Sequence, residues 1–174
     1  MKQNIKLWQV CGFAFSSLLG TLLHFLYEWT NKSILFAPFS GVNESTWEHM
    51  KLLYFPLLIF ALIQRKYFKD YTNFWCAKLI GILSGLTAIP ILFYTYNGAF
   101  GKSPDWFNIT IFFISAAIAF ILETKIMKKG NSDGRHPSIA FCIICFIGIL
   151  FVIFTFRVPQ IPLFQDPVTG RYGI

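Results

Sequence analysis

The sequence predicts an all-α integral membrane protein, a bundle of five transmembrane helices with its N-terminus inside and its C-terminus outside. Three observations predict this class. The chain is 55% hydrophobic and only 13% charged, it contains five apolar stretches of near-bilayer length, and its Lys and Arg residues collect in alternate connectors. An apolar run of about 20 residues spans roughly 30 Å as a helix, and only a helix satisfies every backbone group of such a run. Residues 1–174 are therefore expected to form a single transmembrane domain.

The five predicted spans follow one another with short connectors. They cover about residues 7–29, 47–64, 75–96, 106–127 and 139–156. Aromatic rings with a polar edge favour the headgroup region of a bilayer. Tryptophans stand at four span ends, as this preference predicts: Trp29, Trp47, Trp75 and Trp106.

Small residues and prolines predict how the spans pack. Gly81 and Gly85 form a G-x-x-x-G pattern in the third span, which is typical of close contact between helices. Pro56 and Pro90 stand inside the second and third spans and are expected to kink them.

The distribution of positive charge predicts the orientation. Ten of the fifteen Lys and Arg residues fall on one side and five on the other. The richer side is expected to be cytoplasmic. Its members are Lys2, Lys6, Arg65, Lys66, Lys69, Lys78, Lys125, Lys128, Lys129 and Arg135. Because these charges sit at span ends and form no continuous basic stripe, the net charge of +7 does not indicate a nucleic-acid partner.

Two segments on the expected outer side are unusual. Residues 30–46 include the apolar run Ile34–Phe39, too apolar for a solvated loop and too short to span, so we expect a cap that folds over the bundle or dips into the interface. Residues 157–174 are rich in Pro and Gly, which predicts an extended, turn-rich tail.

One cluster of polar residues indicates a site. Intramembrane His and Glu side chains are costly and are functional candidates by default. His24 and Glu28 are four residues apart on one helix face, and Glu48 and His49 open the next span. Two imidazoles with a carboxylate suit zinc with an open coordination position. We therefore expect His24, Glu28 and His49 as metal ligands, with Glu48 as general base.

Neighbouring polar residues extend this hypothesis, and structural interpretations compete with it. Asn43, Glu44 and Arg171 are candidates for binding a small polar ligand. Against a functional role, Ser45-x-x-Glu48 matches a capping box, and Glu48 with Lys51 is consistent with a surface ion pair of little energetic weight.

Several functions are compatible with an outer-facing His/Glu cluster. One is metal-dependent hydrolysis of a lipid-type substrate by activated water. Another is small-molecule transport, although no inverted repeat is visible. A third is an accessory role in a membrane complex, and the partners expected are the lipid bilayer together with a second copy of the chain or another membrane protein.

Two stretches resemble a known group of sequences. The first is Ser40-Gly-Val-Asn-Glu-Ser-Thr-Trp-Glu-His-Met-Lys51 followed by Leu-Leu-Tyr-Phe-Pro56. The second is Pro162-Leu-Phe-Gln-Asp-Pro167 with Gly170-Arg-Tyr-Gly173. Together they resemble an uncharacterised family of small bacterial multi-pass membrane proteins. The resemblance implies a helical bundle in the bacterial cytoplasmic membrane, and it carries no activity and no functional residues.

Overall fold

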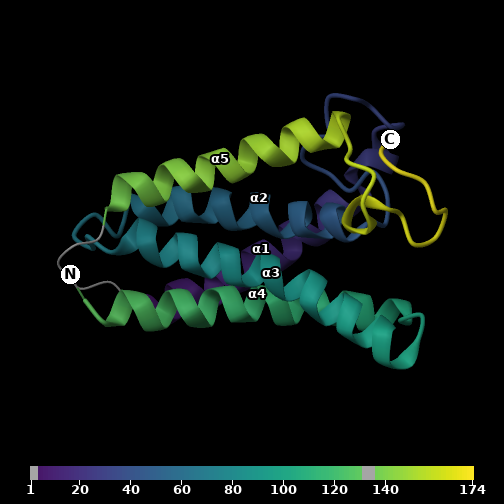
Figure 1. The fold of residues 1–174 in the computed structure, drawn as a ribbon. Coiled ribbons are helices and arrows are strands. Elements are labelled where there is room, and N and C mark those ends of the chain that lie inside the picture. The colour runs from purple at the N-terminus through teal and green to yellow at the C-terminus, as the bar shows by residue number, and fades with distance from the viewer. Residues whose placement is uncertain (1–3, 131–135) are drawn as a thin grey trace.

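A computed structural model describes residues 4–130 and 136–174. Its described residues form five α-helices and one short 3₁₀ helix, without a β-strand (Figure 1). The helices are α1 (Ile5–Trp29), α2 (Thr46–Arg65), α3 (Phe74–Phe100), α4 (Asp105–Lys128), α5 (Pro137–Phe156) and η1 (Pro162–Phe164). All five α-helices are long and apolar enough to cross a membrane, which confirms the predicted fold class.

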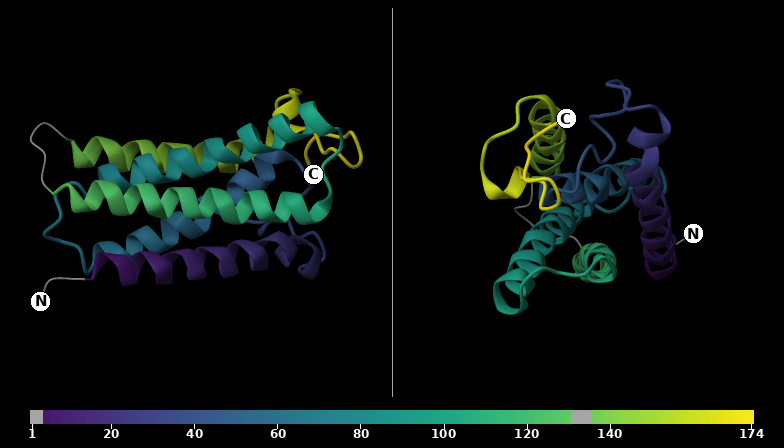
Figure 2. Two further views of the ribbon diagram at one scale, coloured as in Figure 1. Left: turned by 90° about the horizontal axis from the view of Figure 1, so that it is seen from below. Right: turned by 90° about the vertical axis from the view of Figure 1, so that its right-hand side faces the viewer.

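The α-helices run along a common direction, with α2 at the centre of the bundle (Figure 2). α2 contacts each of the other four, and α3 and α4 make the most extensive helix pair. The connector between α1 and α2 and the segment after α5 lie at the same end of the bundle, which we call the capped end. The end where α1 begins is called the opposite end. The orientation of either end relative to a membrane stays a prediction.

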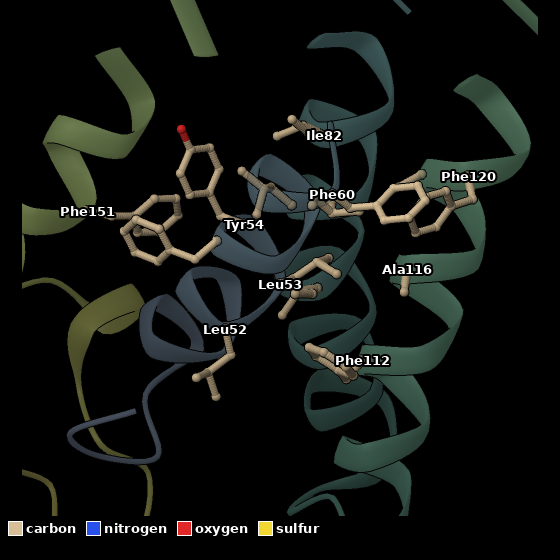
Figure 3. Packing of buried hydrophobic residues seen from close by; sticks show 14 of the residues in the cluster. Leu52, Leu53, Tyr54, Phe60, Ile82, Phe112, Ala116, Phe120 and Phe151 are labelled. Atoms are coloured by element: carbon tan, nitrogen blue, oxygen red, sulfur yellow. The ribbon is translucent and has the colours of Figure 1, made fainter. Parts of the chain in front are cut away.

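Among the described residues, the larger of two apolar core clusters surrounds α2. Leu53, Tyr54 and Phe60 of α2 are almost fully buried, between Phe120 of α4 on one side and Phe151 of α5 on the other (Figure 3). The rings of Tyr54 and Phe151 lie 5.1 Å apart, and those of Phe60 and Phe120 lie 6.1 Å apart. These contacts fix the rotation of α2 about its axis, and hence the direction in which its first turn points.

Glycines let neighbouring backbones approach closely. A Cβ atom on Gly81 would lie 2.9 Å from the Ala119 carbonyl oxygen, and one on Gly85 would lie 3.0 Å from the Ser115 carbonyl oxygen. The G-x-x-x-G face predicted for the third span is therefore the contact surface of α3 with α4.

Pro56 of α2 affects how α1 packs at Gly20. Proline has no N–H, so Pro56 leaves the carbonyl of Leu52, four residues earlier, without its helical donor. A Cβ on Gly20 of α1 would lie 2.9 Å from that carbonyl oxygen and 2.5 Å from the Phe112 ring. Glycine at this position allows α1 to cover the freed carbonyl.

The capped end is closed by the two segments expected to lie there. Ala37 and Ser40 of the α1–α2 connector are fully buried. In the tail, the Phe164 ring packs 4.5 Å from the Trp47 ring at the start of α2. The connector therefore folds over the bundle, whereas the side chains of Ile34 and Leu35 remain exposed, at 68% and 72%.

Candidate functional site

The last turns of α1 bring His24 to the capped end. The Gly41 amide of the connector donates to the Leu23 carbonyl at 3.3 Å, and a Cβ on Gly41 would lie 3.6 Å from His24 Nδ1. The connector thus covers one edge of the imidazole. The other ring nitrogen, Nε2, lies 3.6 Å from Glu44 Oε1.

The first turn of α2 places His49 opposite His24. Ser45 is the N-cap residue of α2, and its side-chain oxygen accepts from the Glu48 amide at 3.4 Å. His49 Nδ1 lies 2.9 Å from the Ser45 carbonyl oxygen. A carbonyl only accepts hydrogen bonds, so Nδ1 carries a proton, and in the neutral tautomer with this proton the lone pair is on Nε2. That Nε2 lies 3.6 Å from Glu44 Oε2.

Together His24, Glu44 and His49 form a compact group of three possible metal ligands, the triad. One ligand atom from each residue lies within 4.8 Å of the other two. The separations of 3.6 Å between carboxylate oxygens and imidazole nitrogens exceed the usual hydrogen-bond range. Two ligand atoms bound about 2.1 Å from a tetrahedral zinc ion are about 3.4 Å apart. Each imidazole Nε2 is therefore about as far from a carboxylate oxygen of Glu44 as two ligands of one zinc ion are from each other.

Glu28 does not join the triad. Its carboxylate lies 3.5 Å from Lys32 Nζ, and both side chains are about two-thirds exposed. Although Glu28 follows His24 by one helical turn, its side chain points to solvent and pairs with Lys32. The expected grouping of Glu28 with His24 and His49 is corrected accordingly: Glu44 from the connector is the carboxylate that faces both imidazoles.

Glu48, expected to act as general base, is held inside the cap. Its Oε2 accepts from the Val42 amide at 3.0 Å and from Lys51 Nζ at 2.6 Å. Only 4% of the Glu48 side chain is exposed, and none of Lys51. The capping box is half formed, because Ser45 caps Glu48 but the Glu48 carboxylate turns to Val42 and Lys51. The pair expected at the surface is buried.

The other candidate ligand residues organise the chain around the triad. Asn43 donates from Nδ2 to the Gly173 carbonyl at 2.9 Å and accepts the Ser45 amide on Oδ1, also at 2.9 Å. Arg171 is exposed, and its backbone carbonyl accepts from the Asp166 amide at 2.9 Å. Asn43 thus joins the C-terminal tail to the residue whose carbonyl orients His49.

A cavity of about 570 Å³ lies beside the triad. Its walls come from α1, α2, α3, α4 and the tail, and all three triad residues contribute to it. Apolar side chains form much of the remaining wall, among them Leu52, Ile89, Phe93, Ile111 and Phe112. This volume falls in the range of small-molecule sites.

A second polar feature, at the opposite end, is absent from the sequence-based predictions. Lys78 of α3 and Glu123 of α4 are almost completely buried and form an ion pair, with Gln9 against the carboxylate. The sequence alone groups Lys78 with the basic residues that set the orientation, because Lys78 stands near a lysine-rich connector. The signal for the buried pair is Glu123, the one acidic residue of the predicted span 106–127.

The fold and site define a class: a multi-pass helical membrane protein with a His/Glu cluster at one end of its bundle. A protein-family model described as a family of unknown function, DUF6512, matches residues 1–174. The chain belongs to that family, which confirms its resemblance to an uncharacterised family. No curated protein and no solved structure shows significant similarity to it.

Proposed function

We propose that this protein binds a divalent transition metal, with zinc as the first choice, through His24, Glu44 and His49 at the outer face of a cell membrane. The observation that carries the proposal is the convergence of two imidazole nitrogens and one carboxylate within 4.8 Å. Residue types also favour zinc, because imidazole and carboxylate groups supply most three-ligand zinc sites.

The surroundings of the triad support metal binding over a purely structural role. The His49 Nδ1 contact with the Ser45 carbonyl is the outer-shell arrangement typical of metal-ligating histidines. Glu44 remains 47% exposed and makes no short hydrogen bond with either histidine. A carboxylate held near two imidazoles without a direct hydrogen bond is available to bind a cation.

The orientation forms part of the proposal. The opposite end carries the larger share of Lys and Arg, so the positive-inside rule places it in the cytoplasm and the triad outside. In the bacterial cytoplasmic membrane this arrangement would expose the triad to extracytoplasmic metal.

A metal-dependent hydrolase is the second candidate function, favoured by the cavity beside the open coordination position. A divalent ion held there would supply Lewis-acid activation of water or of a substrate oxygen. Glu48 is engaged with Lys51 and does not line the cavity, so it is not placed to act as the general base of such a reaction.

Metal content tests the proposal directly. Purified protein equilibrated with zinc and then desalted is expected to retain one zinc ion per chain. His24→Ala, His49→Ala and Glu44→Gln are expected to lose most of it, because each removes one of three ligands. His136→Ala and Glu28→Gln are matched controls, since His136 is the N-cap residue of α5, which begins at the opposite end of the bundle, and Glu28 pairs with Lys32. Absence of zinc from the unmutated protein, or equal loss in the control variants, would refute the site.

A further inference from the structure

We propose that the cavity beside the triad binds a membrane amphiphile with an anionic headgroup, and that metal on the triad is required for tight binding. This inference rests on the proposed metal site and names the ligand class that the site would take. It depends on three features of the cavity. These are its apolar inner part, the part of its wall that faces lipid, and the net charge of the side chains at its polar part toward the capped end, which we call the mouth.

The depth of the cavity suits a hydrocarbon chain. Phe112 of α4 meets α1 at Gly20, where an added Cβ would lie 2.5 Å from the ring, so the two helices close together at this level. Toward the capped end, Ile89, Phe93 and Ile111 line the space and offer only apolar surface. A ligand reaching this depth must itself be apolar there, because an unpaired polar group would lose its hydration without compensation.

The wall of the cavity includes residues that face lipid. Thr21 and Phe25 of α1 and Ile109 and Phe113 of α4 line the cavity and are also exposed. All four belong to helices able to span a membrane, so in a bilayer their exposed surfaces would meet acyl chains. A lipid would therefore enter from the side, between α1 and α4, without leaving the membrane.

Polar groups line the mouth on two sides. The triad stands on one side. On the other, Ser103 bridges the end of α3 and the start of α4: its amide donates to Asn97 Oδ1 at 2.9 Å, and its hydroxyl donates to Asn108 Oδ1 at 2.7 Å. A headgroup placed between the two sides would meet polar partners while its chain occupies the apolar depth.

Metal binding would reverse the charge of the mouth. With neutral imidazoles, the charged side chains lining the cavity are Glu44, Asp105 and Lys102, which sum to one negative charge. A divalent ion on the triad changes this sum to one positive charge and adds an open ligand position for an oxyanion. An anionic phosphate or carboxylate headgroup is then favoured by charge, whereas without metal it is repelled.

Binding of a fluorescent short-chain phosphatidic acid to the purified full-length protein in detergent tests the inference. We expect zinc to tighten its binding by about tenfold or more relative to protein treated with chelator, since a charge reversal next to the ligand is worth at least a factor of ten. Zinc is expected to tighten the binding of phosphatidylcholine with the same chains much less. The logarithm of its fold-change in affinity should be below half of that for phosphatidic acid. Inorganic phosphate is expected to compete only weakly, because it lacks the chain.

A pair of tryptophan variants separates this inference from the metal site. Thr21→Trp fills the cavity from α1, whereas Leu18→Trp places the same ring at an exposed position nearly one turn away that does not line it. Thr21→Trp is expected to weaken phosphatidic acid binding by about tenfold, with zinc content unchanged, and Leu18→Trp to leave both unchanged. If zinc binds but lipid affinity is the same with zinc and with chelator, or if both tryptophan variants bind lipid equally, the amphiphile site is refuted while the metal site stands. Loss of zinc from the unmutated protein would instead refute the proposed function.

Discussion

Lys51 Nζ lies 2.6 Å from the Glu48 carboxylate, and both side chains are buried between α2 and the cap. The same ammonium group donates to the Ala37 carbonyl at 2.8 Å and to Thr155 Oγ1 of α5 at 3.1 Å. One lysine thus joins the start of α2, the connector that supplies Glu44, and the end of α5. Because the connector has no helix of its own, this network determines where Glu44 lies.

Breaking one side of this pair is expected to be costly. Glu48→Gln or Lys51→Met leaves a buried charge without its partner, which typically costs about 3 to 5 kcal/mol. The double variant is expected to be less destabilised than either single variant. Thermal unfolding in detergent measures the effect. Glu28→Gln and Lys32→Met are the matched controls, since that pair is exposed and is worth about 1 kcal/mol or less. Equal losses for the buried and exposed pairs would contradict the assigned burial.

The ion pair at the opposite end makes a similar prediction. Lys78 and Glu123 are 1% and 0% exposed, so Lys78→Met or Glu123→Gln is expected to lower the unfolding temperature strongly. Replacement of both is expected to recover much of the loss. The zinc content should not change, because the pair lies on the far side of the bundle from the triad. A zinc loss in these variants that exceeds their loss of folded protein would show an unexpected coupling between the two ends.

Gly20 is expected to tolerate no side chain. In Gly20→Ala the added methyl group would meet the Phe112 ring and the Leu52 carbonyl, and overpacking of this kind costs about 1 to 3 kcal/mol. Gly98→Ala is the control, because nothing lies within 4 Å of a Cβ at that position. There, alanine is expected to stabilise the helix by up to about 1 kcal/mol. Comparison of the two unfolding temperatures checks the prediction, and an equal response would contradict the close approach of α1 to α2.

Asn43 is expected to act on metal affinity without being a ligand. Asn43→Ala removes the acceptor for the Ser45 amide and the donor to Gly173, and so loosens the residue whose carbonyl orients His49. Loss of such supporting contacts typically weakens metal binding by about 10- to 100-fold. Arg171→Gln is expected to leave zinc affinity unchanged, because its side chain is exposed. Zinc titration of both variants measures this, and an equal effect would give Arg171 a direct role.

The sequence predicts the helices and two of the three triad residues as metal ligands, and the physical reasons are clear. Apolar length alone identifies membrane spans, and His24 and His49 stand at the facing ends of consecutive spans, so their proximity follows from chain connectivity. The choice of Glu44 over Glu28 does not follow from periodicity. Glu28 follows His24 by one helical turn, yet its side chain is exposed and pairs with Lys32, whereas Glu44 is positioned by turns in an irregular connector.

The burial of charged side chains is the other feature that helical periodicity does not predict. Lys51 and Lys78 each stand within a turn or two of a span end, where lysine usually reaches the interface. Their burial depends on partners from other elements: the Ala37 carbonyl of the connector and Thr155 of α5 for Lys51, and Glu123 of α4 for Lys78. Only the three-dimensional packing identifies these partners.

The most direct test of the central claim is X-ray absorption spectroscopy at the zinc edge of the zinc-loaded protein. The account predicts a first shell that includes two imidazole nitrogens at about 2.0 to 2.1 Å and carboxylate oxygen at about 2.0 to 2.2 Å, without sulfur. The imidazole signal should fall in His24→Ala and in His49→Ala, and it should persist in His136→Ala. A shell that contains sulfur at about 2.3 Å, or only oxygen, would contradict a metal site at His24, Glu44 and His49.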